Sequence, residues 1–166
     1  MLRHAKSSWD DRALADHDRP LGPRGVRAAA LLVRHLERQR VRPDVILSSS
    51  ARRARETLDG IAGALGDDAQ LLVEHELYGA GVGTLIARLR RLDPSVTSAL
   101  VIGHNPGLQA LVVALAGDGD DEALASVRDK FAPAALATLS LPGRSWSGVA
   151  PGVAYLEGCF VPRHRR

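Results

Sequence analysis

The chain has 166 residues, of which 45% are hydrophobic and 25% are charged, as in an ordinary globular protein. This length suits one domain with a substantial core, and we expect residues 1–166 to form that domain. No apolar run approaches the ~20 residues that cross a bilayer, and charged residues interrupt the first segment at once. We therefore expect neither a membrane span nor a signal peptide.

The net charge is +3, from 22 Lys and Arg and 19 Asp and Glu, and the basic residues are spread along the chain. Only the tail Arg163-His164-Arg165-Arg166 is dense, and a short basic tail is usually a solvated end. Nucleic acid is therefore not the expected partner. The single cysteine, Cys159, lies in an apolar stretch that favours a packed position. With one cysteine no intrachain disulfide can form, which agrees with a cytoplasmic protein.

The first predicted element is a very short strand. Only Met1 and Leu2 precede a polar turn, whereas a strand usually has about five residues. We expect a first strand that is apparently truncated: either the natural start lies upstream of Met1, or this strand is unusually short. Residues 10–23 are polar with interspersed Pro and Gly, which predicts a loop. Residues 24–40 carry apolar side chains at helical spacing, and 45–47 form a short apolar run typical of a buried parallel strand.

The rest of the chain continues this alternation. We expect a helix over 51–65, a buried strand at 71–73, and a helix over 82–92 that stops before Pro94. A strand follows at 99–102, and then a helix over 106–116, capped by Asn105, with Pro106 at its first position. Residues 117–121 indicate an acidic turn, and 134–141 and 153–161 predict two late strands that could form a hairpin.

This order of elements predicts the fold class. Alternating strands and helices are typical of an α/β domain with a mostly parallel central sheet and helices on both faces, a three-layer α/β/α arrangement. In such sheets, ligands bind beyond the carboxyl ends of the strands.

Basic side chains follow three of the predicted strands: His4, Arg53 and His104 each come just after one. We expect them to meet, with Arg3, around a pocket for a phosphoryl group, because arginine forks match phosphate oxygens. His4 can attack phosphorus if one ring nitrogen is unprotonated, and neighbouring guanidiniums favour that neutral form. Its other nitrogen should donate to a backbone carbonyl. We expect His104 to add positive charge around the equatorial oxygens.

Five ordered motifs extend this pattern over nearly the whole chain. They are Leu2-Arg3-His4-Ala5-Lys6-Ser7-Ser8-Trp9, then Asp16-His17-Asp18-Arg19-Pro20-Leu21 followed by Arg24-Gly25, then Ser49 with Arg53-Ala54 and Thr57, then Glu76-Leu77-Tyr78, and Val101-Ile102-Gly103-His104-Asn105-Pro106. With them the chain resembles the histidine phosphatase (phosphoglycerate-mutase-like) superfamily and, within it, the small SixA-type phosphohistidine phosphatases. The resemblance implies a phosphoglycerate-mutase-like fold.

The resemblance also implies roles for particular residues. His4 would be the phosphorylated nucleophile, and Arg3, Arg53 and His104 would form the phosphate pocket. Glu76 aligns with the general acid of the superfamily. Arg19 would contact the substrate phosphate or support the pocket.

Ser49 belongs to a run of three serines that no Gly-x-Ser-x-Gly elbow surrounds, so we expect a strand-end loop that touches the pocket. The histidines outside the motifs lack metal-ligand spacing, and we expect no metal or other cofactor.

The activity implied is that of a cofactor-independent histidine acid-type phosphatase. Its substrate would be phosphohistidine on a protein, or a related small phospho-substrate. Two alternatives stay open: a general phosphomonoesterase of the same superfamily, and a module that binds phosphorylated ligands or nucleic acid without turnover.

Overall fold

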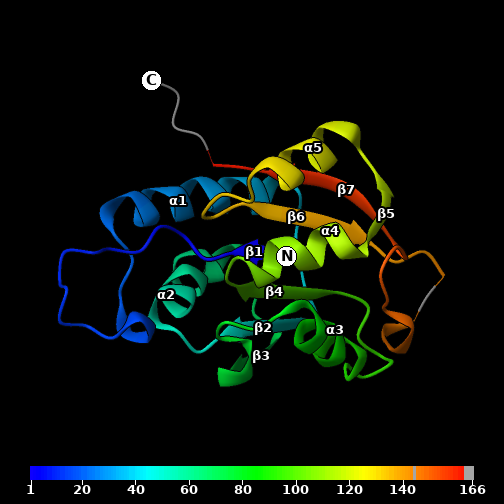
Figure 1. The fold of residues 1–166 in the computed structure, drawn as a ribbon, viewed down its shortest axis with the longest axis horizontal. Coiled ribbons are helices and arrows are strands. Elements are labelled where there is room, and N and C mark those ends of the chain that lie inside the picture. Colours follow the sequence, from blue (N-terminus) through cyan, green and yellow to red (C-terminus); the bar gives the residue numbers. More distant parts are fainter. Residues whose placement is uncertain (144, 163–166) are drawn as a thin grey trace.

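The computed structural model describes residues 1–143 and 145–162, so the basic tail lies outside the described residues. Within them, the strands form one sheet in the order β3-β2-β4-β1-β6-β7-β5. Figure 1 shows β1 in the middle of the molecule, with β4 and β2 on one side and β6 and β7 on the other. The strands are β1 (Leu2–Arg3), β2 (Val45–Ser49), β3 (Gln70–Glu74), β4 (Ala99–Gly103), β5 (Ala116–Gly119), β6 (Leu136–Ser140) and β7 (Ala154–Phe160).

Helices cover both faces of this sheet. They are α1 (Pro23–Arg38), α2 (Arg52–Ile61), α3 (Val82–Arg90), α4 (Gly107–Leu115) and α5 (Asp121–Asp129). One core cluster joins α1 and α2 to the sheet through residues such as Leu32, Leu36 and Ile61. The other joins α3, α4 and α5 through residues such as Leu111 and Val127. The expected three-layer α/β/α arrangement is confirmed. No helix among the described residues is long and apolar enough to cross a bilayer.

Most strand pairs in the sheet are parallel. β1 with β4, β4 with β2, β2 with β3, and β5 with β7 run parallel, while β6 is antiparallel to both β1 and β7. The mostly parallel sheet and the late β6–β7 hairpin are therefore confirmed. Cys159 on β7 is partly buried against the core, in agreement with the packed position expected for it.

Three local predictions are wrong. β3 is not buried, because it is an edge strand: Leu71 and Val73 are 50% and 46% exposed. The expected acidic turn is the short strand β5, which pairs with β7, and a helix, α5, follows it. Asp120 caps this helix by accepting a hydrogen bond from the backbone N–H of Ala123 at 2.8 Å.

Asn105 does not cap α4, the helix that follows it in the chain, as expected. The N-cap position of α4 is Pro106, and no side chain caps that helix end. The Asn105 amide instead donates to the side chain of Gln109 and to the carbonyl of Phe131, both at 3.0 Å. These longer-range partners compete with capping and fix the segment that follows His104.

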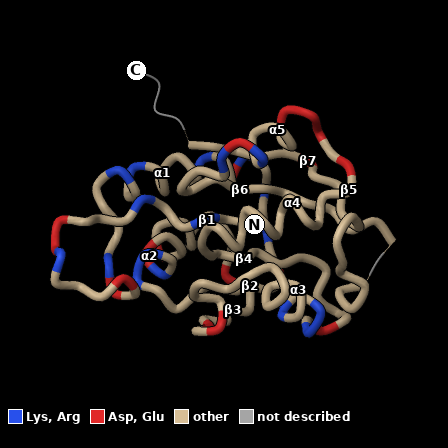
Figure 2. Tube along the Cα trace, in the orientation of Figure 1, with Lys and Arg blue, Asp and Glu red and all other residues tan. Residues whose placement is uncertain are grey.

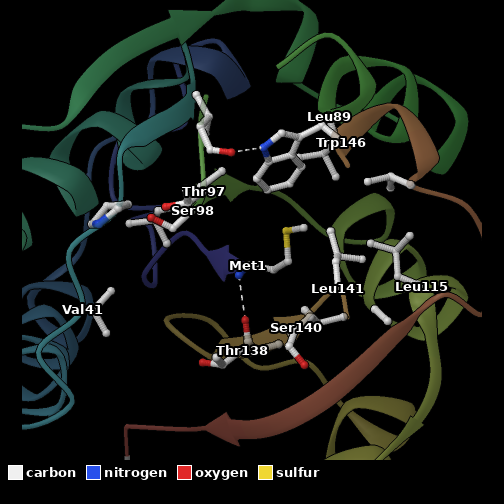
Figure 3. Close-up of a pocket in the computed structure, with 18 of the residues that line it drawn as sticks. Met1, Val41, Leu89, Thr97, Ser98, Leu115, Thr138, Ser140, Leu141 and Trp146 are labelled. Carbon is white, nitrogen blue, oxygen red and sulfur yellow. Dashed lines mark hydrogen bonds between the residues drawn. The ribbon is translucent and has the colours of Figure 1, made fainter. Parts of the chain in front are cut away.

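β1 is as short as expected, with two residues. Leu2 lies opposite Ile102 of β4 and opposite Leu136 of β6. Next to the start of β1, a cavity of about 670 Å³ opens between the start of β4 and strand β6, and Met1 and Trp146 help to line it (Figure 3). This cavity lies at the end of β1 away from His4, so it is separate from the predicted phosphate pocket.

α1 packs closely against the loop that follows β1. The Gly22 N–H donates to the carbonyl of Lys6 at 2.9 Å, and a Cβ atom added at Gly25 would lie 2.3 Å from the same carbonyl oxygen. Only glycine allows this approach, which holds the segment just after His4 against the start of α1.

Replacing Gly25 tests this contact. We expect Gly25→Ala to lower the free energy of unfolding by about 1–3 kcal/mol, because backbone must move to admit the methyl group. Urea unfolding measures the effect. Gly63→Ala is the control: its Cβ would meet nothing within 4 Å, and it should unfold like the wild type or slightly later. Equal stability of the two variants would contradict this account of the contact.

Candidate active site

Three neighbouring parallel strands bring the predicted pocket residues together. His4 follows β1, His104 follows β4, and Arg53 lies in the first turn of α2, just after β2. Because these strands are adjacent and parallel, their carboxyl ends meet at one edge of the sheet. The rings of His4 and His104 are 4.9 Å apart between centroids, and both residues are 8% exposed.

Arg53 lies between the two histidines. Its Nε donates to Nε2 of His4 at 3.3 Å, and its Nη2 lies 3.4 Å from Nδ1 of His104. Arg53 is 6% exposed, so its charge acts where little water screens it. His4, Arg53 and His104 thus converge on one site.

The contacts of His4 define its tautomer. Nδ1 lies 2.7 Å from the carbonyl of Ala5, which can only accept, so Nδ1 carries the proton. Nε2 therefore presents a lone pair toward Arg53. The pKa of His4 is lowered to about 3, mainly by burial and further by the nearby His104, Arg53 and Arg3, while the hydrogen bond to the Ala5 carbonyl opposes the shift. His4 is a neutral imidazole at neutral pH, as expected from its guanidinium neighbours.

Thr57 joins the segment after His4 to α2. Its Oγ1 accepts from the backbone N–H of Ala5 at 2.9 Å and donates to the carbonyl of Arg53 at 2.6 Å. Thr57 is fully buried, so both bonds are protected from water. One hydroxyl therefore sets the spacing between the backbones that carry His4 and Arg53.

His104 is held by Ser49, whose Oγ lies 2.7 Å from Nε2 of the ring. The Nη2 group of Arg53 approaches Nδ1, so Nε2 carries the proton. Burial and then the Arg53 charge lower the pKa of His104 to about 4. This differs from the expected positive charge on His104, since burial beside a guanidinium disfavours a second cation. Ser49 reaches the site through His104.

Arg3 is held by the segment between α5 and β6. Its Nη1 donates to the carbonyl of Phe131 at 2.8 Å, the same carbonyl that Asn105 contacts. Its Nε is buried without a hydrogen-bond partner among residues 1–143 and 145–162. The Arg3 charge is close enough to lower the pKa of both histidines.

Arg19 supports the loop that follows His4. Its Nε donates to the carbonyl of Ser8 at 3.0 Å, its Nη2 to Oγ of Ser7 at 2.7 Å, and its Nη1 to Asp16 at 2.9 Å. Its guanidinium also stacks on the exposed ring of Trp9. In the described residues, the hydrogen bonds of the Arg19 guanidinium go to this loop and to Asp16, which favours a supporting role over direct contact with the substrate phosphate.

Glu76 is not joined to the pocket. Its carboxylate binds the guanidiniums of Arg91 and Arg88, and no recorded bond links it to His4, Arg53 or His104. Two residues further on, the ring of Tyr78 lies edge-on to His104, with centroids 5.5 Å apart. In the described residues, Tyr78 and not Glu76 is the member of its motif that reaches the site.

The sequence predicts no role for Asp16, yet this residue contacts Arg53 and Tyr78 directly. Its carboxylate accepts from Nη2 of Arg53 at 3.0 Å and from the Tyr78 hydroxyl at 2.7 Å. The sequence does mark Asp16, since this residue opens the motif that ends in Arg19-Pro20-Leu21.

No group of three His, Cys, Asp or Glu side chains in residues 1–143 and 145–162 is arranged to hold a metal ion.

Comparison with known proteins agrees with this geometry. Residues 1–85 match the model of the histidine phosphatase superfamily (branch 1). An uncharacterized protein of Mycobacterium tuberculosis is 43% identical over 98% of this chain and 100% of its own. Phosphohistidine phosphatase SixA of Escherichia coli is 33% identical over 69% of this chain and 71% of its own. A solved structure of the protein histidine phosphatase SixA complexed with tungstate has 26% identity and a TM-score of 0.77, covering 97% of this chain and 94% of that one.

The lowered histidine pKa values predict a dependence of stability on pH. The unfolded chain binds protons at His4 and His104 below about pH 6.5, whereas the folded chain does so only near pH 3–4. The stability these residues provide is therefore complete above pH 6.5 and decreases as the pH falls, by up to about 1.4 kcal/mol per pH unit for each histidine.

Urea unfolding at pH 7 and pH 5 measures this effect. We expect His104→Gln to lose less stability than the wild type between these pH values, by about 1–2 kcal/mol. Identical losses in both proteins would show that His104 is not buried as a neutral ring.

Proposed function

Since the chain belongs to the histidine phosphatase superfamily, we propose that it hydrolyses phosphohistidine on a protein through a covalent phosphohistidine intermediate on His4. The chain is a phosphatase of this superfamily; the substrate and the residue roles are our proposal. The observation that carries the proposal is the lone pair of His4 Nε2, which points at the guanidinium of Arg53 in a buried cluster with His104.

In the first step, the phosphoryl group would take the place between His4, Arg53 and His104. His4 Nε2 attacks phosphorus with its lone pair, so an N–P bond to the enzyme forms while the bond from phosphorus to the substrate nitrogen breaks. The freed substrate imidazole keeps the bonding electrons and takes a proton from solvent. The Nδ1–H bond to the Ala5 carbonyl stabilises the positive charge that develops on the His4 ring.

In the second step, water hydrolyses the intermediate. A water oxygen attacks phosphorus, the bond between phosphorus and Nε2 breaks, and the electron pair returns to His4. Inorganic phosphate leaves with the oxygen of the water, and the site is restored. Phosphoryl transfer of this kind needs positioning and positive charge more than further covalent chemistry.

The charge would come from Arg3, Arg53 and His104. The Nε and Nη2 groups of Arg53 already face the space beside both rings, and the Nε of Arg3 has no recorded partner. A bound phosphoryl dianion raises the pKa of a neighbouring imidazole, so His104 would become cationic once the substrate is bound. In this proposal, His104 is neutral until the phosphoryl group binds and then becomes a cation.

Two features favour phosphohistidine as the substrate. Glu76 is engaged by arginines, so the site offers no carboxylic acid there, and a phosphoramidate leaving group demands less proton donation than an alkoxide. Two relatives bear names that specify histidine phosphatase activity, and one of them was solved with tungstate, a tetrahedral oxyanion like phosphate.

We propose that residues 1–166 act as one cytoplasmic domain.

The charge distribution does not favour the nucleic-acid alternative. Basic residues are spread over α1, α2 and α3 and are interspersed with acidic ones in the described part of the chain (Figure 2). A nucleic-acid site would need its cations gathered on one face.

Turnover of a phosphohistidine peptide and of p-nitrophenyl phosphate tests the proposal. We expect the peptide to be preferred, with acid-labile phosphate on the enzyme during turnover. His4→Ala should abolish both turnover and labelling. The control His35→Gln, which alters a ring stacked on Phe160 away from the site, should keep both. Full activity of His4→Ala would end the proposal, and a preference for the monoester would replace it with a general phosphomonoesterase.

Glu76→Gln tests whether this carboxylate is the general acid. Because Glu76 is bound to Arg91 and Arg88, we expect kcat with either substrate to stay within about twofold of the wild type. A general acid normally contributes ~100-fold or more. A loss of that size, in a protein of unchanged thermal stability, would restore Glu76 to the mechanism.

A further inference from the structure

Asp16 ties together three side chains around the proposed pocket. Its Oδ2 accepts hydrogen bonds from Nη2 of Arg53 at 3.0 Å and from the hydroxyl of Tyr78 at 2.7 Å. Its Oδ1 accepts from Nη1 of Arg19 at 2.9 Å, and its backbone carbonyl accepts from Nη1 of Arg53 at 2.6 Å. Asp16 is the residue through which the loop before α1 holds Arg53.

The two edges of the Arg53 guanidinium have different partners. The edge formed by Nη1 and Nη2 faces the carbonyl and carboxylate of Asp16. The edge formed by Nε and Nη2 faces His4 Nε2 at 3.3 Å and His104 Nδ1 at 3.4 Å. A guanidinium is planar with its N–H groups in a fixed fork, so fixing one edge determines where the other points. In the proposed reaction, the edge toward the histidines is the one that would meet the phosphate oxygens.

Asp16 is ionised at neutral pH. The pKa of Asp16 is lowered to about 2, chiefly by the hydrogen bond from Tyr78 and also by Arg53 and Arg19. The residue therefore has no proton to give to a leaving group. Its charge instead compensates the guanidinium of Arg53, which is nearly buried and would be costly without a partner.

Tyr78 connects Asp16 to the side of the site where His104 lies. Its hydroxyl donates to Asp16, while its ring lies nearly perpendicular to those of His104 and His17, with centroids 5.5 Å and 5.0 Å apart. The hydroxyl thus joins the loop that carries Asp16 to the segment after β3.

From this geometry we propose that Asp16 is a positioning residue, which orients the Arg53 guanidinium toward the phosphoryl group without contacting that group itself. This inference rests on the proposed phosphatase function. Without the Asp16 carboxylate, the guanidinium loses an ionic partner on its outer edge and no longer presents a fixed fork to the anion.

Binding of inorganic vanadate and turnover of p-nitrophenyl phosphate test the inference in the full chain. We expect Asp16→Asn to weaken vanadate binding about 10-fold or more and to lower kcat/KM similarly, because a hydrogen bond to a charged group is lost. Asp18→Asn is the matched control: its carboxylate contacts the ring of His17 and is 64% exposed, so both values should stay within about twofold.

A double-mutant cycle with Arg53→Lys separates positioning from general damage to the fold. If Asp16 acts through the guanidinium, Asp16→Asn should change vanadate affinity less than about twofold in the Arg53→Lys background. Tyr78→Phe, which removes one donor to Asp16 but keeps the ring, should weaken binding in the same direction by a smaller factor. Tyr78→Phe replaces Asp16→Asn in the double-mutant cycle if the Asp16→Asn protein does not fold.

Two results would contradict the inference. One is an Asp16→Asn protein that binds vanadate as tightly as the wild type; the other is an equal loss in both backgrounds of the cycle. A wild type that binds vanadate and hydrolyses no phospho-substrate would instead refute the proposed function, which makes the two failures distinguishable.

Discussion

The structure depends on keeping His4 neutral although it is buried beside the positive charges of Arg53 and Arg3. His4 can offer a lone pair only if its ring is unprotonated and its tautomer is fixed. Burial beside Arg53 and Arg3 disfavours the imidazolium, and the Ala5 carbonyl takes the Nδ1 proton in a 2.7 Å hydrogen bond. Nε2 is then the nitrogen that faces the pocket. The same charges that would bind a phosphoryl group therefore also prepare the nucleophile.

The surrounding fold holds the backbone of that histidine within narrow limits. β1 has only two residues, but it lies between β4 and β6, so Leu2 is fixed from both sides. Beyond the strand, the hydroxyl of Thr57 spaces Ala5 from α2, and Gly25 lets α1 approach the following turn. These short contacts support the segment that carries His4 together with the pairing of β1.

The sequence was sufficient to predict the fold class and the convergence of His4, Arg53 and His104. Each residue follows an apolar run, and the three strands concerned, β1, β4 and β2, are adjacent and parallel. It was insufficient where tertiary contacts decide. β5 and α5 lie in a polar stretch with little periodicity, and only pairing with β7 and capping by Asp120 define them. Asp16 lies in a loop, far from Arg53 in sequence, so no spacing rule predicts their contact. The motif containing Glu76 marks the right segment, but the turn after β3 directs Tyr78 to the site.

The most direct test of this account is the ionisation state of the His4 ring. Nitrogen-15 NMR of histidine-labelled protein, assigned with His4→Gln, reports the tautomer and charge of each ring across the pH range. The account predicts a neutral His4 with the proton on Nδ1 from pH 8 down to pH 5, in agreement with a pKa near 3. A His4 ring that becomes an imidazolium between pH 6 and pH 7, or one that carries its proton on Nε2, would contradict it.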